Sequence, residues 1–329
     1  MRHVFILNPC AGKKQVALTL REQIEAYFAA HPQEEYSIRL TDAVGAATRI
    51  AQEECAKGDR VRLYACGGDG TLQETASGIP LYSNAELTVV PCGSGNDYVR
   101  TFGGSEAFLD LPALIEGEAM PVDAVDCDGK LSLNIAAIGM DAKVAAKMNR
   151  YKHLPGVSGS LAYNLAIVDV FCHPIGDEMD IVIESENGRV ERTGKYFLAL
   201  AANGQYYGGG YHGAPHAIED DGLLDFVLVK KISRFRVLGF LKKYKAGDYD
   251  DLPYCEHIRG TAMTVTAKKR TPTARWTVNV PVQTRCHSLS YRMPIALLSL
   301  RRSLRRKRRH VRSSVERLLC LLCEQILKN

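Results

Sequence analysis

The sequence predicts an α/β protein built on a doubly wound parallel sheet, followed by an antiparallel, β-rich region. Up to about residue 121, short apolar strands alternate with helical patterns, which is typical of a parallel sheet covered by helices. Beyond Pro121, strands joined by turn dipeptides such as Asp128-Gly129 replace this rhythm. We therefore expect domains at 1–121 and 122–300, with the last strands able to return to the first domain, and a basic tail at 301–329.

The first domain is expected to read β-α-β-α-β-α-β. Its strands are predicted at 3–7, 36–40, 60–65 and 87–90, and its helices at 13–30, 44–56, 72–77, 97–102 and 108–115. In the second domain we predict two hairpins, 122–127 with 130–136 and 180–184 with 195–202, around a helical insertion at 142–172. Further strands are expected at 223–229, 262–266, 276–280 and 287–293.

The bulk composition indicates a protein of the cytoplasm with an uneven charge. The net charge is +5, but the tail from Arg301 holds ten Lys/Arg and two Asp/Glu, which leaves the remainder at −3. The ten cysteines include one close pair, Cys320 and Cys323, without a second pair beside it, so a zinc site is not expected. The chain enters a strand at once and contains no apolar run of about 18 residues, which predicts neither a signal peptide nor a transmembrane helix.

Three polar turns that contain glycine follow three of the expected strands. They are 8–14 (Asn-Pro-Cys-Ala-Gly-Lys-Lys), 66–71 (Cys-Gly-Gly-Asp-Gly-Thr) and 91–97 (Pro-Cys-Gly-Ser-Gly-Asn-Asp), and each opens a helix. Glycines let backbone N–H groups approach a phosphate, and ligands of open α/β sheets bind at the carboxyl ends of the strands. Asp69 would repel a phosphate unless a cation lay between them. This favours a metal or water-network role over a helix cap, the alternative being a plain tight turn.

Together the three turns resemble the catalytic domain of the diacylglycerol kinase family, in its bacterial lipid-kinase branch, within the NAD kinase-like superfamily. The matching motifs are Asn-Pro-x-x-Gly, Gly-Gly-Asp-Gly-Thr and Gly-Ser-Gly-Asn-Asp, and the likeness runs from about residue 1 to 300. The resemblance implies a Rossmann-like nucleotide domain, a β-sandwich domain and a cleft between them. A polar loop at 203–210 also matches and would lie near that cleft.

The resemblance implies that ATP binds against the three turns. The implied nucleotide-binding residues are Asn8, Pro9, Cys10, Ala11, Gly12, Thr41, Gly67, Gly68, Asp69, Gly70, Thr71, Gly93, Ser94, Gly95 and Asn96. An alternative role for Thr41 is to cap the helix that is expected from Val44.

The same resemblance implies two uses of Mg²⁺. Asp69, Asp97 and Asp123 would join a water-bridged network, with a helix cap as the alternative for Asp97. The stretch 218–225 matches the family's Asp-Gly-x-Leu-Asp signature, in which a structural metal would be held by Asp221 and by the carbonyls of Ile218 and Leu223. An ordinary Asp-Gly turn is the alternative there.

The general base of the family is replaced in this chain. The family carries Asp-Gly-Glu after a strand that ends in Asn, and the Glu is the proposed base. Here the matching strand is followed by Pro281-Val282-Gln283, and a gapless alignment puts Gln283 at the base position. A carboxamide cannot serve as a base near neutral pH. We therefore expect impaired activity, unless another group substitutes or the segment is a sequence error.

The tail predicts contact with a membrane. A basic run at 301–309 precedes apolar residues at helical spacing, which suits an anionic membrane surface. The alternatives are a solvated helix, a nucleic-acid patch and non-native read-through. We expect a lipid substrate at the membrane, a peripheral position on the inner face, and no nucleic-acid partner, and a homodimer is possible.

Three functions compete on this evidence. The first is an ATP-dependent lipid kinase acting on diacylglycerol or a related lipid alcohol. The second is a soluble kinase such as NAD kinase, which shares Gly-Gly-Asp-Gly-Thr. The third, motivated by Gln283, is a non-catalytic nucleotide- or lipid-binding protein. The Gly-Ser-Gly-Asn-Asp and Asp-Gly-Leu-Leu-Asp stretches favour the lipid branch.

Overall fold

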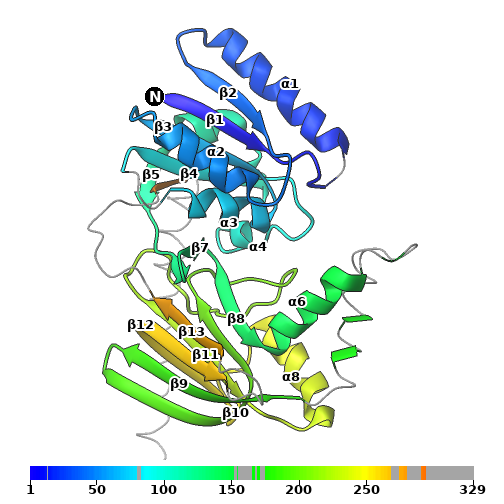
Figure 1. The fold of residues 1–329 in the computed structure, drawn as a ribbon. Helices are drawn as coiled ribbons and strands as arrows, with labels where there is room; N and C mark the ends of the chain where they lie inside the picture. The colour runs from blue at the N-terminus through cyan, green and yellow to red at the C-terminus, as the bar shows by residue number, and fades with distance from the viewer. Residues whose placement is uncertain are drawn as a thin grey trace, which may run out of the picture.

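The computed structural model describes residues 1–12, 14–79, 83–151, 154, 165–166, 169–170, 175–267, 274–279 and 290–293. Their strands form two sheets, drawn one above the other in Figure 1. Gln283, Cys320, Cys323 and the tail 301–329 lie outside the described residues. No helix in the described part of the chain is both long and apolar enough to cross a membrane.

The first sheet has six strands in the order β2-β1-β3-β4-β14-β5. Their bounds are β1 Arg2–Leu7, β2 Tyr36–Leu40, β3 Val61–Gly67, β4 Ala85–Pro91, β5 Glu118–Pro121 and β14 Ser290–Met293. β1 to β4 are mutually parallel, and β14 is parallel to β4 but antiparallel to β5. Every residue of β1, β3 and β4 is buried, as expected for central strands covered on both faces. The predicted parallel α/β sheet is therefore confirmed.

The helices of this half follow the predicted alternation. They are α1 Lys14–Ala30, α2 Ala46–Cys55, α3 Asp69–Ser77, α4 Asp97–Arg100 and α5 Leu111–Glu116, with a short 3₁₀ turn at Glu106–Phe108. On α1, Leu20, Ile24 and Phe28 are buried in one core with β1 and β3. Their i+4 spacing places them on one face of the helix, which explains how the apolar stripe covers the sheet.

The second sheet is antiparallel and partly closed. Its strands are β6 Val125–Cys127, β7 Lys130–Ser132, β8 Ile135–Gly139, β9 Asp177–Ser185, β10 Gly188–Ala202, β11 Leu224–Lys230, β12 Cys255–Ala267 and β13 Ala274–Asn279. Because β11 pairs with both β10 and β12, and β9 pairs with the same two strands, these four form a ring. Apolar side chains such as Ile181, Phe226 and Met263 form a common buried cluster on these strands. The predicted antiparallel second unit is confirmed.

Two helices cover the other face of this sheet. α6 Met140–Tyr151 and α8 Arg234–Ala246 lie beside β8 and β10 in Figure 1. On α8, Val237, Phe240 and Tyr244 are buried against Phe197 and neighbouring strand residues. The sequence analysis did not predict α8. It was also wrong to run the first hairpin through Ala136, because β7 ends at Ser132 and the next strand pairs with β10.

Candidate functional site

Three turns meet at the carboxyl edge of the first sheet, after β1, β3 and β4. The backbone N–H of Asn8 donates to the carbonyl of Cys66 at 3.0 Å, and its Nδ2 donates to Thr71 Oγ1 at 3.1 Å. Gly12 has φ +63°, and a Cβ added there would lie 2.3 Å from the carbonyl oxygen of Cys92. The first turn is therefore locked to the second by hydrogen bonds and to the third by close packing that only glycine allows.

The third turn is folded upon itself by Asn96. The residue is left-handed, with φ 48° and ψ 47°, which asparagine tolerates better than most residues. Its Oδ1 accepts from the N–H of Gly93 at 3.0 Å, and its Nδ2 donates to the carbonyl of Gly93 at 2.9 Å. The Asn96 side chain thus shapes the turn, and a nucleotide would meet backbone groups that it has already fixed.

Asp69 joins the second turn to the third. Its two carboxylate oxygens accept the N–H groups of Asp97 and Tyr98 at 3.1 and 3.0 Å. Asp69 therefore binds the first N–H groups of α4, while its own helix α3 has Gly68 at the N-cap and no side-chain cap. A carboxylate oxygen can accept more than one hydrogen bond, so these two bonds still leave capacity for water or a metal-bound water.

Asp97 connects the two halves of the molecule. Its side chain is buried, and its Oδ2 accepts the N–H of Gly209 at 2.7 Å, from the loop that follows β10. Its Oδ1 lies 3.2 Å from Arg100 Nε but has no hydrogen-bond donor among the described residues. Burial raises the pKa of the Asp97 carboxyl above its ordinary value. This buried carboxylate therefore lies at the junction of the two halves, with partners from both.

A cleft of about 180 Å³ lies between the two sheets at this point. Its lining includes, from the first half, Asp69, Gly70, Leu72, Gln73, Asp97 and Tyr98, and from the second, Ser132, Leu133, Asn134, Ile135, Tyr207 and Gly208. Asn134 Nδ2 donates to the carbonyl of Tyr206 at 2.7 Å and so fixes the 203–210 loop against the cleft. The 203–210 loop was expected near the cleft, but Asn134 was not expected there, because it fell inside the strand predicted at 130–136.

Behind the cleft lies a buried polar chain. The Tyr207 hydroxyl donates to the carboxylate of Asp141 and lies 2.9 Å from the Tyr244 hydroxyl. Burial raises the pKa of Asp141 to about 6, and the hydrogen bond from Tyr207 opposes that rise. No sequence motif pointed to this pair, because its members are 66 residues apart.

Asp123 lies against the 218–223 loop and not against the 203–210 loop. It is not among the residues that line the cleft. Its Oδ2 accepts the N–H of Gly222 at 2.7 Å, and its own N–H donates to the carbonyl of Glu219 at 2.6 Å. Burial, followed by the nearby carboxylates Asp221 and Asp220, raises the pKa of Asp123. The structure thus groups Asp69 with Asp97, and groups Asp123 with the predicted metal stretch.

The one carboxylate proposed for a structural metal, that of Asp221, is paired within the protein in this arrangement. Asp221 Oδ1 accepts the N–H of Leu223 at 3.1 Å, and its Oδ2 forms an ion pair with Arg259. Within the described ranges, no group of three His, Cys, Asp or Glu side chains could hold a metal ion. The alternative, an Asp-Gly turn at 221–222, agrees with the hydrogen bonding seen here.

Thr41 lies at the same edge of the sheet, where its N–H continues the β1–β2 pairing by donating to Leu7 at 3.0 Å. The alternative role for Thr41 as a helix cap is wrong. α2 begins at Ala46, and the residue at its N-cap is Gly45, with φ 84°.

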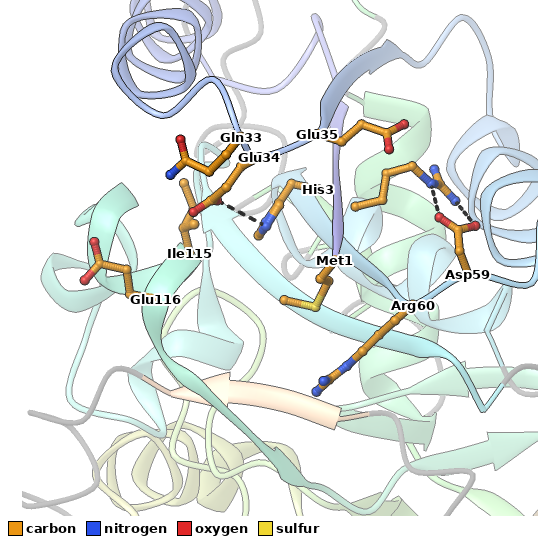
Figure 2. Close-up of a pocket in the computed structure, with 10 residues that line it drawn as sticks. Met1, His3, Gln33, Glu34, Glu35, Asp59, Arg60, Ile115 and Glu116 are labelled. Carbon is orange, nitrogen blue, oxygen red and sulfur yellow. Dashed lines mark hydrogen bonds and ion pairs between the residues drawn. The ribbon is translucent and has the colours of Figure 1, made fainter.

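A larger cavity, of about 540 Å³, lies at the opposite edge of the first sheet and is shown in Figure 2. Some of its polar side chains contact one another: Arg2 Nε lies 2.7 Å from Asp59, and His3 Nε2 lies 3.5 Å from Glu34. Burial lowers the pKa of His3 to about 4, so its imidazole is neutral at pH 7. We assign the chemistry to the smaller cleft, because the glycine turns end there and the cavity lies at the amino ends of the strands.

A parallel α/β sheet with glycine turns at its carboxyl edge, facing an antiparallel unit across a cleft, is typical of enzymes that bind a nucleotide at that edge. The model of the diacylglycerol kinase catalytic domain matches residues 2–127. The model of the YegS C-terminal NAD kinase beta sandwich-like domain matches residues 134–284. The chain belongs to the diacylglycerol kinase catalytic-domain family, in its YegS-like lipid-kinase branch.

Relatives agree with this family, and a solved structure shares the fold. A "Probable lipid kinase YegS-like" of Pseudomonas fluorescens is 32% identical over 245 residues, which cover 72% of this chain and 76% of the relative. The "Diacylglycerol kinase" of Bacillus subtilis is 28% identical over 233 residues, 69% of this chain and 73% of the relative. The crystal structure of a diacylglycerol kinase from Bacillus anthracis has a TM-score of 0.64 at 20% identity, covering 90% of this chain and 98% of that one, and shows the same fold.

Proposed function

We propose that this chain is an ATP-dependent kinase that phosphorylates the hydroxyl of diacylglycerol or a related lipid alcohol. The observation that carries the proposal is the meeting of three glycine turns beside a cleft whose wall holds Asp69 and Asp97. Backbone amides at such an edge bind phosphates, and carboxylates beside them suit a nucleotide that arrives with its cation. The names of the relatives support a lipid acceptor, and we propose that the product enters phospholipid metabolism.

ATP would lie along the residues predicted from the sequence, with its phosphates toward the three turns. The missing side chains of Gly12, Gly68 and Gly93 support this, because a Cβ at any of them would approach the neighbouring turn. Magnesium bound to the nucleotide would neutralise phosphate charge during transfer. Asp97, with an oxygen that lacks a hydrogen-bond donor among the described residues, and Asp69 would hold its water shell.

The acceptor hydroxyl must lose a proton when it attacks the phosphoryl group. Gln283 cannot take that proton, so the proposal includes slow turnover. We also propose that the chain works at the inner membrane face, where its lipid substrate resides, with the basic tail as the anchor.

The test follows the label from [γ-³²P]ATP. The full chain, with Mg²⁺, is offered diacylglycerol in detergent micelles or NAD, and Asp69→Ala provides the inactive control. We expect labelled lipid phosphate, formed slowly, and no labelled dinucleotide. A labelled dinucleotide would replace the proposal with the NAD kinase reading. ATP binding without either product would leave a non-catalytic binding protein.

A further inference from the structure

The predicted metal stretch binds a cation that belongs to the chain itself. We propose that the guanidinium of Arg259 takes the place of a divalent metal at Asp221 and holds the 218–223 loop on the second sheet. The proposal concerns the folded chain and stands whether or not the kinase function does. It starts from the ion pair between Arg259 Nη2 and Asp221 Oδ2, which joins residues 38 positions apart.

The strand pairing explains why Arg259 reaches this loop. β11 and β12 run antiparallel, with Asp225 opposite Arg259, so the arginine lies at the end of β11 from which the loop enters. Its backbone carbonyl accepts the N–H of Glu186 at 3.1 Å, and its Nη1 lies 3.6 Å from the Glu186 carboxylate. The Arg259 and Asp221 side chains are 30% and 24% exposed. A pair this shielded is screened less by salt than a surface pair.

Asp221 and Asp225 each have at least one partner within the protein, although Asp225 Oδ2 accepts no hydrogen bond among the described residues. Asp221 has the N–H of Leu223 and the guanidinium, and Asp225 bonds to His257 Nε2. A divalent ion would have to displace Arg259 to reach Asp221, which would leave a guanidinium without its carboxylate. One of the two positive charges that a divalent metal would bring is therefore already present beside Asp221.

The ion pair also has a consequence for Asp123, which the same loop holds. The same loop donates the N–H of Gly222 to Asp123 and accepts the N–H of Asp123 through the carbonyl of Glu219. Arg259 is thus a positioning residue, because it fixes the loop that fixes Asp123. It needs to touch neither substrate nor nucleotide for this role.

Thermal unfolding of the full chain without nucleotide tests the proposal. The Tm of the native chain should be the same in millimolar Mg²⁺ and in EDTA. Arg259→Met should lower the Tm by about 2–6 °C in EDTA, and Mg²⁺ or Ca²⁺ should restore part of the loss. Arg259→Lys keeps the positive charge but not the paired N–H donors of the guanidinium. Its Tm should fall less than that of Arg259→Met, and Mg²⁺ should raise its Tm less.

Asp221→Asn locates the effect. The double variant Arg259→Met/Asp221→Asn should gain nothing from Mg²⁺, and its Tm loss should be smaller than the sum of the two single losses. Glu186→Gln is the matched control, because it removes the weaker partner of Arg259, and it should remain indifferent to the metal. The proposal would be overturned if Mg²⁺ raised the Tm of the native chain. It would also be overturned if the Tm loss of the double variant equalled the sum of the losses of Arg259→Met and Asp221→Asn.

Discussion

Gly68 and Gly93 approach each other so closely that a Cβ added at Gly93 would lie 2.5 Å from the Cα of Gly68. Real Cβ atoms do not approach backbone carbon to this distance, so the second and third turns pack backbone against backbone. The edge proposed to hold the nucleotide phosphates therefore depends on the absence of side chains as much as on the presence of any functional group.

The first prediction follows from this contact. Gly93→Ala should lower the free energy of unfolding by about 1–3 kcal/mol, because one turn must move away from the other. Gly70→Ala is the matched control, since a Cβ there meets nothing within 4 Å, and its stability should be unchanged or slightly higher. Urea unfolding of both variants measures the difference. Equal stabilities would show that the turns are not in contact in solution.

The second prediction concerns Asp69. Asp69→Ala should abolish turnover, and it should also lower stability by about 0.5–2 kcal/mol, because the N–H groups of Asp97 and Tyr98 lose their acceptor. Asp69→Asn keeps one acceptor oxygen and should regain part of the stability but not the turnover. Initial rates and Tm, measured on the same preparations, separate the two roles. Near-normal turnover of either variant would refute the catalytic role.

The third prediction is a pH dependence set by Asp141. Burial raises its pKa from 3.8 to about 6, so ionising it costs more in the folded state than in the unfolded state. The stabilisation that the protonated Asp141 carboxyl gives the folded state is fully present below about pH 4. It is lost as the pH rises from there to about 6. Because asparagine does not titrate, the stability of Asp141→Asn relative to the native chain should rise across this interval. Urea unfolding at several pH values checks this, and parallel curves for the two proteins would contradict it.

The fourth prediction concerns the tail, which lies outside the described residues. Truncation after Leu300 should weaken binding to vesicles that contain anionic lipid and remove most of its salt dependence, since about 1 kcal/mol is at stake per engaged basic residue. Neutral vesicles provide the control. The truncation leaves β14 in place, so the fold should persist. Vesicle binding that does not change would rule out the anchor.

The fifth prediction concerns Gln283. General-base assistance is worth about 10²–10⁴-fold in rate, so Gln283→Glu should raise lipid phosphorylation while ATP binding stays constant. Pro281 and Val282 could misplace the new carboxylate, because proline fixes φ. Restoring Asp-Gly-Glu at all three positions is therefore the second variant. A native chain already as fast as the triple variant would show that another residue acts as base.

The first sheet could be predicted because its signals are local. β1, β3 and β4 are short apolar runs, and each ends in a turn whose glycines the sequence displays directly. α8 could also have been found. Val237, Phe240 and Tyr244 recur at helical spacing, and Gly247 ends the helix in the left-handed conformation. The basic residues between them obscured the pattern.

The pairings within the site could not be predicted from the sequence. Asp69 caps a helix that begins 28 residues later, and Arg259 reaches Asp221 across 38 residues. Such contacts depend on how strands are ordered in the sheets, and neither periodicity nor turn chemistry determines that order. From the sequence we could therefore predict the functional groups and the sheet edge at which they lie, but not the hydrogen-bond and ion-pair partners of each group.

The position of β14 has a consequence for how the chain is made. β14 pairs with β4 on one side and β5 on the other, yet it leaves the ribosome roughly 200 residues after β4. Until then, the edge of β4 is left with open N–H and C=O groups, a template for unwanted strand pairing. Synthesis of the glycine turns is complete within the first third of the chain, but the sheet that supports them closes only when the second unit has been made.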